Sequence, residues 1–158
     1  MAKSAREWFS NWNITSLKIN ASFLEVELDF RDEDKKAAWE LYVELLTRIA
    51  TQPLPNNHGD EKAALDSIYA IFPTTRDILK KYGSDCIQFS KIAIIVLNQI
   101  IRPFTAEWHG KSLKGDFNDP VQCLEFRKDL EKLQINLRNY MRLLSEIAQV
   151  EDLTDLED

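Results

Sequence analysis

The chain has 158 residues, of which 44% are hydrophobic and 29% charged, and its formal net charge is −6. This length predicts one domain with one core, and the composition excludes collagenous, low-complexity and wholly disordered chains. The acidic balance argues against a protein that coats nucleic acid or an anionic membrane, because both partners require clustered lysine and arginine.

The first predicted element is a β-hairpin at about residues 14–30. Apolar residues alternate with polar ones there, but Leu17 and Ile19 have one parity and Val26 and Leu28 the other. This change of phase, near Asn20, predicts a turn or bulge between two strands. A two-stranded hairpin is marginally stable alone, so we expect it to pack on helices. Three aromatic residues before it would cover the core or mark an interface: Trp8, Phe9 and Trp12.

Two helices are predicted next. The first spans about residues 33–51, opens with acidic residues that suit a helix N-terminus, and stops at the proline-rich loop 53–59. The second opens at Asp60 and meets Pro73. Because proline lacks a backbone donor, we expect a kink or break there, with Thr74 or Thr75 capping the restarted helix.

A third helix begins at Ser84 and ends near Gly110. Its apolar residues occupy nearly all sides, which predicts a position in the middle of a bundle. The most apolar run, Ile92–Ile101, contains Asn98 and Gln99 and falls short of the roughly 20 residues that span a bilayer. The sequence therefore predicts a buried helix rather than a membrane span.

The fourth helix begins at Asp119, which fits an N-cap, with Pro120 at the first helical position and Gln122 as the reciprocal capping residue. Apolar residues at spacings of three and four form a seam for the bundle core or for a partner helix. The seam comprises Cys123, Phe126, Leu130, Leu133, Leu137, Tyr140, Leu144 and Ile147.

The C-terminal residues 151–158 form an acidic tail with five acids and no base. A solvated tail is the favoured interpretation, and docking of Leu153 and Leu156 on a basic surface is the alternative. The sequence thus predicts a mainly α protein, a four- to five-helix bundle with an N-terminal β-hairpin, as a single domain over residues 1–150 followed by the tail.

A polar stripe on the third helix is the main candidate site. Asn98, Arg102, Thr105 and His109 follow at spacings of four, three and four, so they share one helix face, and Trp108 lies beside them. A buried, unpaired arginine is costly, so Arg102 must reach solvent, meet a carboxylate or line a cleft that admits an anion. In a structural role, Arg102 would pair with an acid such as Glu107 while Trp108 and His109 close the end of the bundle.

In a helical bundle, Arg102, six intervening residues and His109 resemble the motif of the HEPN family of nucleases. In that family, two protomers bring the arginine and the histidine together around an RNA phosphate, and cleavage needs no metal. The resemblance implies that Arg102 would stabilise phosphate charge and that His109 would transfer a proton. The chain departs from the pattern at Pro103, where the family usually has a polar residue. Residues 102–149 also hold eight bases against seven acids, so no basic groove accompanies the motif.

The pattern of Leu97-Asn98, Arg102-Pro103-Phe104 and Trp108-His109 also resembles uncharacterised helical proteins of bacteria, some encoded near antiviral defence systems. This resemblance implies a bacterial source and a defence-linked role, without a reaction. We expect a non-enzymatic protein-interaction module whose partner is another protein, including a second copy in a homodimer, with no membrane contact. The alternative is a dimeric, metal-independent ribonuclease that acts through Arg102 and His109, and nucleic acid is a partner only in that case.

No cofactor or metal is expected. A metal site would need His58 with Asp60 and Glu61, but a catalytic zinc has three protein ligands and His58 fits a solvated turn residue. Cys86 and Cys123 are far apart and are expected to be reduced thiols, which indicates the cytoplasm. The N-terminus lacks the apolar run of a signal peptide, which agrees with that location.

Overall fold

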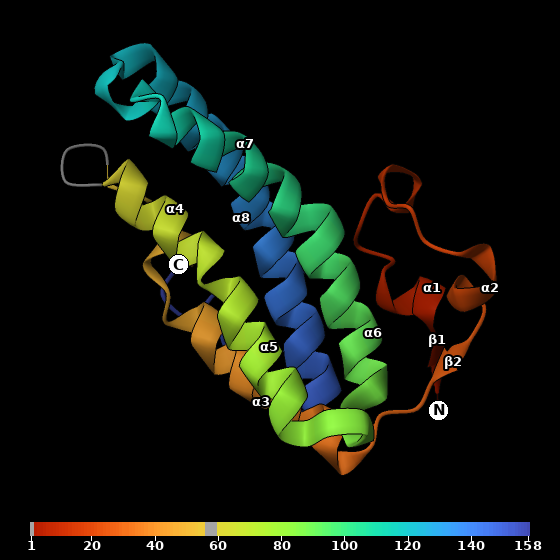
Figure 1. Ribbon diagram of the computed structural model, residues 1–158. Helices are drawn as coiled ribbons and strands as arrows, with labels where there is room; N and C mark the ends of the chain where they lie inside the picture. The colour runs from red at the N-terminus through yellow and green to blue at the C-terminus, as the bar shows by residue number, and fades with distance from the viewer. Residues whose placement is uncertain (1, 56–59) are drawn as a thin grey trace.

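The computed structural model describes residues 2–55 and 60–158 and is mainly helical (Figure 1). Four helical rods form a bundle, and an N-terminal segment containing a small strand pair lies beside α6. The rods are α3 (Asp32–Leu46); α4 (Glu61–Tyr69) with α5 (Ile71–Tyr82); α6 (Ile87–Ile95) with a π-helical turn (Val96–Ile101) and α7 (Arg102–Leu113); and α8 (Pro120–Ala148). Short 3-10 turns occupy Ile14–Ser16, Ile49–Thr51, Gly83–Cys86 and Asp116–Asn118. The predicted helical bundle with an N-terminal β-hairpin is confirmed.

The strand pair joins the chain's start to the end of the predicted hairpin region. β1 (Lys3–Ser4) is antiparallel to β2 (Glu27–Leu28), with Lys3 opposite Leu28. The first strand therefore lies outside residues 14–30, and the position predicted for it is wrong. The cause is local: the Asn20 side chain accepts the Ser22 N–H at 2.8 Å and caps the helix α2 (Ala21–Leu24), so the change of phase marks a helical turn.

The aromatic residues before the strand pair cover the core. Phe9, just after α1 (Ala5–Trp8), is fully buried, and Trp12 is buried against Tyr140 of α8 in an edge-to-face contact with ring centroids 6.2 Å apart. Gln99 holds the following loop, because its side chain accepts the Lys18 N–H and donates to the Lys18 carbonyl. The N-terminal segment is thus part of the core rather than a separate unit.

A buried carboxylate links two helix starts. Asp34 in the first turn of α3 is fully buried, and its oxygens accept the Arg31 N–H and the Phe89 N–H, each at 2.8 Å. Acidic residues favour helix N-termini, and here one carboxylate satisfies backbone donors of both α3 and α6. Asp34 thus joins the starts of α3 and α6, and these two helix starts lie at the lower end of the bundle in Figure 1.

The break near Pro73 lies earlier than predicted. α4 ends at Tyr69 and α5 begins at Ile71, so Pro73 lies in the first turn of α5, where its missing N–H is no loss. Neither threonine caps the new helix: Thr74 accepts a hydrogen bond from Arg48 at 2.8 Å, and the buried Thr75 hydroxyl has no partner among the described residues. The predicted recapping is therefore wrong.

The third rod is buried on one side rather than all round. Ile92, Val96 and Ile101 are fully buried, whereas Ile87 and Ile94 are each 48% exposed. The prediction of a helix buried on every side is wrong, because four rods and a short N-terminal segment leave part of its surface uncovered. The π-helical turn ends at Ile101, two residues before Pro103, whose missing backbone donor relaxes the normal helical hydrogen bonding.

One described helical stretch, within Glu61–Leu113, is long and apolar enough by length and composition to cross a membrane. Of its most apolar window, 44% is buried inside the structure. Core helices of soluble proteins pass the same test, so the finding is weak evidence for a membrane span and is compatible with a soluble protein.

α8 follows the predicted seam. Phe126, Leu137 and Leu144 are fully buried, and Asp119 caps the helix by accepting the Val121 N–H at 2.9 Å. Gln122 does not complete a reciprocal cap, because its buried Oε1 has no partner among the described residues. The seam therefore serves the bundle core.

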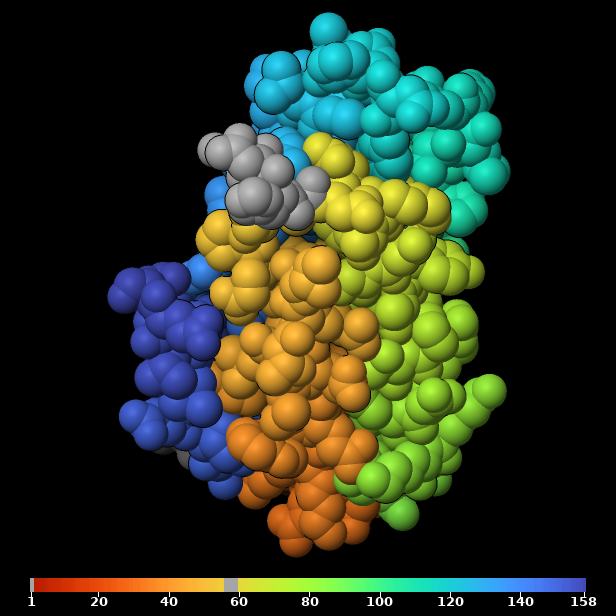
Figure 2. Space-filling model, turned by 90° about the vertical axis from the view of Figure 1, so that its left-hand side faces the viewer, coloured from red at the N-terminus to blue at the C-terminus, as the bar shows by residue number. Residues whose placement is uncertain are grey.

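The C-terminal tail is docked, and the favoured interpretation of a solvated tail is wrong. The Tyr42 hydroxyl accepts the Leu153 N–H at 2.5 Å and donates to Asp152 at 3.2 Å. Arg138 forms ion pairs with Asp155 and Asp158 at 3.0 and 2.8 Å. Bases of α8 thus attract the acids of the tail, which lies along α3 in dark blue in Figure 2.

Candidate functional sites

The polar stripe divides into an exposed and a buried part. Asn98, Arg102 and His109 are exposed, whereas Thr105 is 5% exposed and Trp108 is fully buried. The Thr105 hydroxyl donates to the Arg102 carbonyl at 3.1 Å, so it is satisfied by its own helix. The stripe is therefore not a continuous polar surface.

Arg102 is held by a neighbour on its own helix and by an aromatic ring of α5. Its Nε and one terminal nitrogen donate to the Asn98 side-chain oxygen at 3.3 and 3.1 Å. Its guanidinium carbon lies 4.8 Å from the centroid of the Phe72 ring, in cation–π contact. Of the three outcomes considered for Arg102, the structure shows the solvent-exposed one, without a carboxylate partner among the described residues.

His109 lies against α4 rather than beside Arg102. Its ring centroid is 6.0 Å from that of Tyr69, which in turn is 5.9 Å from Phe72. A row of four side chains therefore runs along the seam of α7 with α4 and α5, with the arginine and the histidine at its ends. Seven residues of helix separate the two by about 10 Å along the axis, so they do not form a joint catalytic pair within one chain.

Trp108 is a structural anchor. Its indole N–H donates to Asp129 at 3.0 Å, and its ring contacts Phe126 edge to face with centroids 5.2 Å apart. Lys111 covers the outer face of the ring at 4.3 Å and pairs with Glu107 at 3.0 Å. Trp108 is thus buried against α8, whereas His109 is exposed, and Glu107 pairs with Lys111 rather than with Arg102.

The cysteines do not have the environment of reactive thiols. Both are free, and burial raises the pKa of the Cys86 thiol and of the Cys123 thiol above the ordinary value. A raised pKa lowers the thiolate fraction at neutral pH and so the nucleophilicity. Within residues 2–55 and 60–158, no group of three or more possible metal ligands is present, and the His58 considered for a metal site lies outside the described residues.

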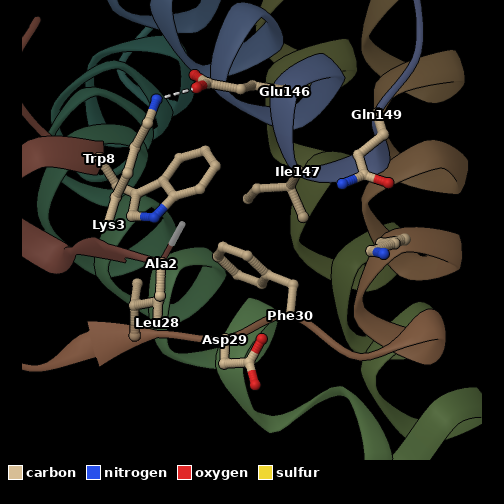
Figure 3. A pocket seen from close by; sticks show the side chains of 10 residues that line it. Ala2, Lys3, Trp8, Leu28, Asp29, Phe30, Glu146, Ile147 and Gln149 are labelled. Carbon is tan, nitrogen blue, oxygen red and sulfur yellow. Dashed lines mark hydrogen bonds and ion pairs between the residues drawn. The ribbon is translucent and has the colours of Figure 1, made fainter.

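A pocket of about 240 Å³ lies where the strand pair meets the end of α8 (Figure 3). Lys3 forms an ion pair with Glu146 across it, and Trp8 packs edge to face on Phe30 with centroids 5.0 Å apart. The Trp8 indole N–H is buried without a partner among the described residues. Lys3 and Glu146 neutralise each other, so the pocket presents no net charge from this pair to a ligand.

A groove of about 440 Å³ lies between α3 and α5, on the face shown in Figure 2. Trp39 and Val43 line it and are 43% and 37% exposed. Of the residues that the structure describes, three acids and no base line the groove: Glu40, Glu44 and Asp77. Sequence analysis missed it because its walls come from different helices, although Trp39 and Val43 stand one helical turn apart and off the core face of α3.

Glu40 and Glu44 are fixed at the rim of this groove. Glu40 accepts hydrogen bonds from Lys81 at 2.6 Å and from the Tyr82 hydroxyl at 2.5 Å. Burial opposes ionisation of Glu40, but these two hydrogen bonds outweigh burial and lower its pKa, so the carboxylate stays charged. Glu44 pairs with Arg48 at 3.1 Å, whereas Asp77 has no ion-pair partner among the described residues.

A second groove, of about 450 Å³, lies along α8 beside Pro53 and Leu54. Leu124 and Ile135 of α8 line it and are 61% and 63% exposed. These residues were not singled out from the sequence, because the stronger seam of α8 dominated its pattern. The sequence feature that could have identified them is a weaker heptad spacing on the face of α8 opposite the core seam.

Comparisons of the chain with protein-family models, with curated proteins and with solved structures found no match.

Proposed function

We propose that this protein is a non-enzymatic protein-interaction module that binds a basic, apolar-containing segment of another protein in the groove between α3 and α5. The half-exposed Trp39 carries the proposal, in a groove where Asp77 has no ion-pair partner among the described residues. Tryptophan contributes strongly to binding energy when a partner buries it, because its large rigid ring loses little conformational entropy.

Charge on the groove selects the partner's chemistry. Among the described residues, Asp77 lacks an ion-pair partner and no lysine or arginine lines the groove. A segment with lysine or arginine beside a large apolar side chain would meet Asp77 with its charge and Trp39 with its apolar part. Such complementarity increases the association rate and disfavours acidic partners.

The cellular setting of the proposal comes from the sequence. The resemblance of residues 97–109 to helical proteins of bacterial defence loci supports a place in a bacterial multi-protein system. Two free cysteines, one fully buried, suit the reducing cytoplasm. Arg102 and His109 contact different neighbours, Phe72 and Tyr69, which argues against a joint catalytic role within one chain.

The test compares four forms of the immobilised protein in an extract of the native host: wild type, Trp39→Ala, Tyr69→Ala and Asp77→Lys. Tyr69 is the matched control, because it is a large aromatic residue, 52% exposed, on a different face. We expect the same bound protein with wild type and Tyr69→Ala, and its loss with Trp39→Ala. Asp77→Lys should also abolish capture. Equal capture by all four forms would contradict the proposal.

A metal-independent ribonuclease is the second candidate, favoured by the exposure of both Arg102 and His109 along one seam of α7. A second protomer would have to bring the two groups to one phosphate. The assay uses generic single-stranded RNA with chelator present and compares wild type with His109→Ala and with Trp39→Ala. Cleavage lost only in His109→Ala would replace the interaction module by the nuclease. RNA that is intact with all three forms, or cleaved equally by all three, would contradict the nuclease hypothesis.

A further inference from the structure

A regular stripe of residues lies on the outer face of α8 and has no use in the fold. It consists of Val121, Leu124, Lys128, Glu131 and Ile135, and is called here the α8 stripe. Its spacings of three, four, three and four place the five at alternating core positions of a heptad. Val121, Leu124 and Ile135 are 62%, 61% and 63% exposed, and Lys128 and Glu131 are also exposed.

The stripe is separate from the seam that holds α8 in the bundle. Phe126, Leu130, Leu133 and Leu137 carry that seam and are at most 5% exposed. Three large apolar residues aligned in water cost free energy that burial in an interface would recover. A heptad stripe with two opposite charges at its centre has the pattern of a helix-pairing surface.

We infer that the α8 stripe pairs with the α8 stripe of a second copy of this chain, antiparallel and about a two-fold axis between Asp129 and Leu130. In that register, Leu124 faces Ile135 of the second copy, and Lys128 faces Glu131. The two-fold axis repeats each contact, so the dimer contains two apolar pairs and two ion pairs at its centre. This surface is distinct from the groove that carries the proposed function.

Charge fixes the orientation of the pair. A parallel, in-register arrangement would place Lys128 against Lys128 and Glu131 against Glu131, which is repulsive. Along one edge of the stripe, Glu125 and Lys132 occupy equivalent flanking positions one heptad apart, where an antiparallel partner presents the opposite charge. The antiparallel arrangement therefore satisfies charges that the parallel one opposes.

Neither Lys128 nor Glu131 forms a strong ion pair among the described residues. Lys128 contacts Glu125 at 3.5 Å, and both side chains are more than half exposed, so this pair contributes little. Glu131 has no ion-pair partner among the described residues. At the ends of the stripe, Val121 would meet the stem of Arg138, whose charge Asp155 and Asp158 already neutralise.

Exchange of the two central charges tests both the dimer and its orientation. Lys128→Glu or Glu131→Lys alone places like charges opposite each other twice, and we expect the dimer dissociation constant in sedimentation equilibrium to rise about tenfold at low salt. The double variant restores both ion pairs and should return to the wild-type value. An equimolar mixture of the two single variants should form heterodimers, because all facing charges are then opposite.

Matched apolar variants control for folding. Ile135→Ser should raise the dissociation constant by at least about tenfold, because two symmetric apolar contacts are lost. Ile94→Ser, at a half-exposed isoleucine of α6, should leave it unchanged. Trp39→Ala should remain dimeric, which separates this inference from the proposed function. A monomeric wild type at all concentrations, or a double variant no tighter than the single ones, would overturn the inference.

Discussion

The polar stripe near α7 and the α8 stripe differ in how many of their residues form contacts within the chain. On α7, polar residues interrupt an apolar helix, yet Arg102 bonds to Asn98 and covers Phe72, Thr105 bonds to its own helix, and Trp108 bonds to Asp129. On α8, the five residues of the α8 stripe are exposed and none is used by the core. The fold therefore explains the polar residues on α7, but it does not explain why the apolar residues of the α8 stripe are exposed.

Trp108→Ala should have the largest effect on stability, and it tests the structural role of the residues beside the polar stripe. The substitution removes a fully buried indole and its hydrogen bond to Asp129. We expect a loss of about 3–5 kcal/mol in the free energy of unfolding, measured by urea denaturation. A loss below about 1 kcal/mol would show that α7 is not anchored through this residue.

Tyr42→Phe tests the tail that neutralises Arg138 at the end of the α8 stripe. The variant keeps the buried ring but removes the hydroxyl that accepts the Leu153 N–H. An unsatisfied amide costs about 1–3 kcal/mol, so the tail should detach locally. Faster hydrogen exchange at Leu153, with unchanged exchange at Leu137, is the expected result, and unchanged exchange at both positions would contradict the docked tail.

The same docking should depend on pH. Burial opposes ionisation of Asp152, but hydrogen bonds from the Thr154 hydroxyl and amide and from Tyr42 outweigh it and lower its pKa below 3.8. The stabilisation is therefore fully present above pH 3.8 and is lost as the pH falls through the lower, folded-state pKa. The Thr154 amide resonance should report the transition, and Asp152→Asn should abolish it. A transition that survives Asp152→Asn would assign the dependence to other groups.

Arg102→Ala and Leu124→Ala should have the smallest effects on stability. The two variants compare an exposed residue of the polar stripe with one of the α8 stripe. Arg102 loses one exposed cation–π contact and its bonds to Asn98, so we expect a loss of about 0.5–1 kcal/mol. Leu124 is 61% exposed, and its truncation should change the monomer's stability by less than about 0.5 kcal/mol. Thermal unfolding at low protein concentration measures both, and a larger effect of Leu124→Ala would show that the α8 stripe is already buried in the monomer.

Much of the bundle was predictable because it depends on local patterns. Asp119 and Pro120 mark the start of α8, and the spacing from Phe126 to Leu144 marks its buried face. The strand partner of Glu27–Leu28 was not predictable, since strands of two residues carry no periodicity. The tail's docking depends on Tyr42, which lies more than a hundred residues away along the chain.

The candidate sites were predictable only in part. Arg102 and His109 of α7 and Asn98 of the preceding π-helical turn are exposed, an outcome that the sequence left open for Arg102. The bond from Trp108 to Asp129 depends on the position of α8, which no local pattern signals. The groove at Trp39 exists only because α5 lies beside α3. Exposure of Leu124 and Ile135 likewise depends on which face of α8 the other rods cover.

Hydroxyl-radical footprinting at increasing protein concentration compares both stripes in one sample. If the α8 stripe is the unsatisfied surface, Leu124 and Ile135 should become less reactive as concentration rises, while His109 and Tyr69 keep their reactivity. Protection of His109 with unchanged Leu124 and Ile135 would contradict the account and place the interface on α7.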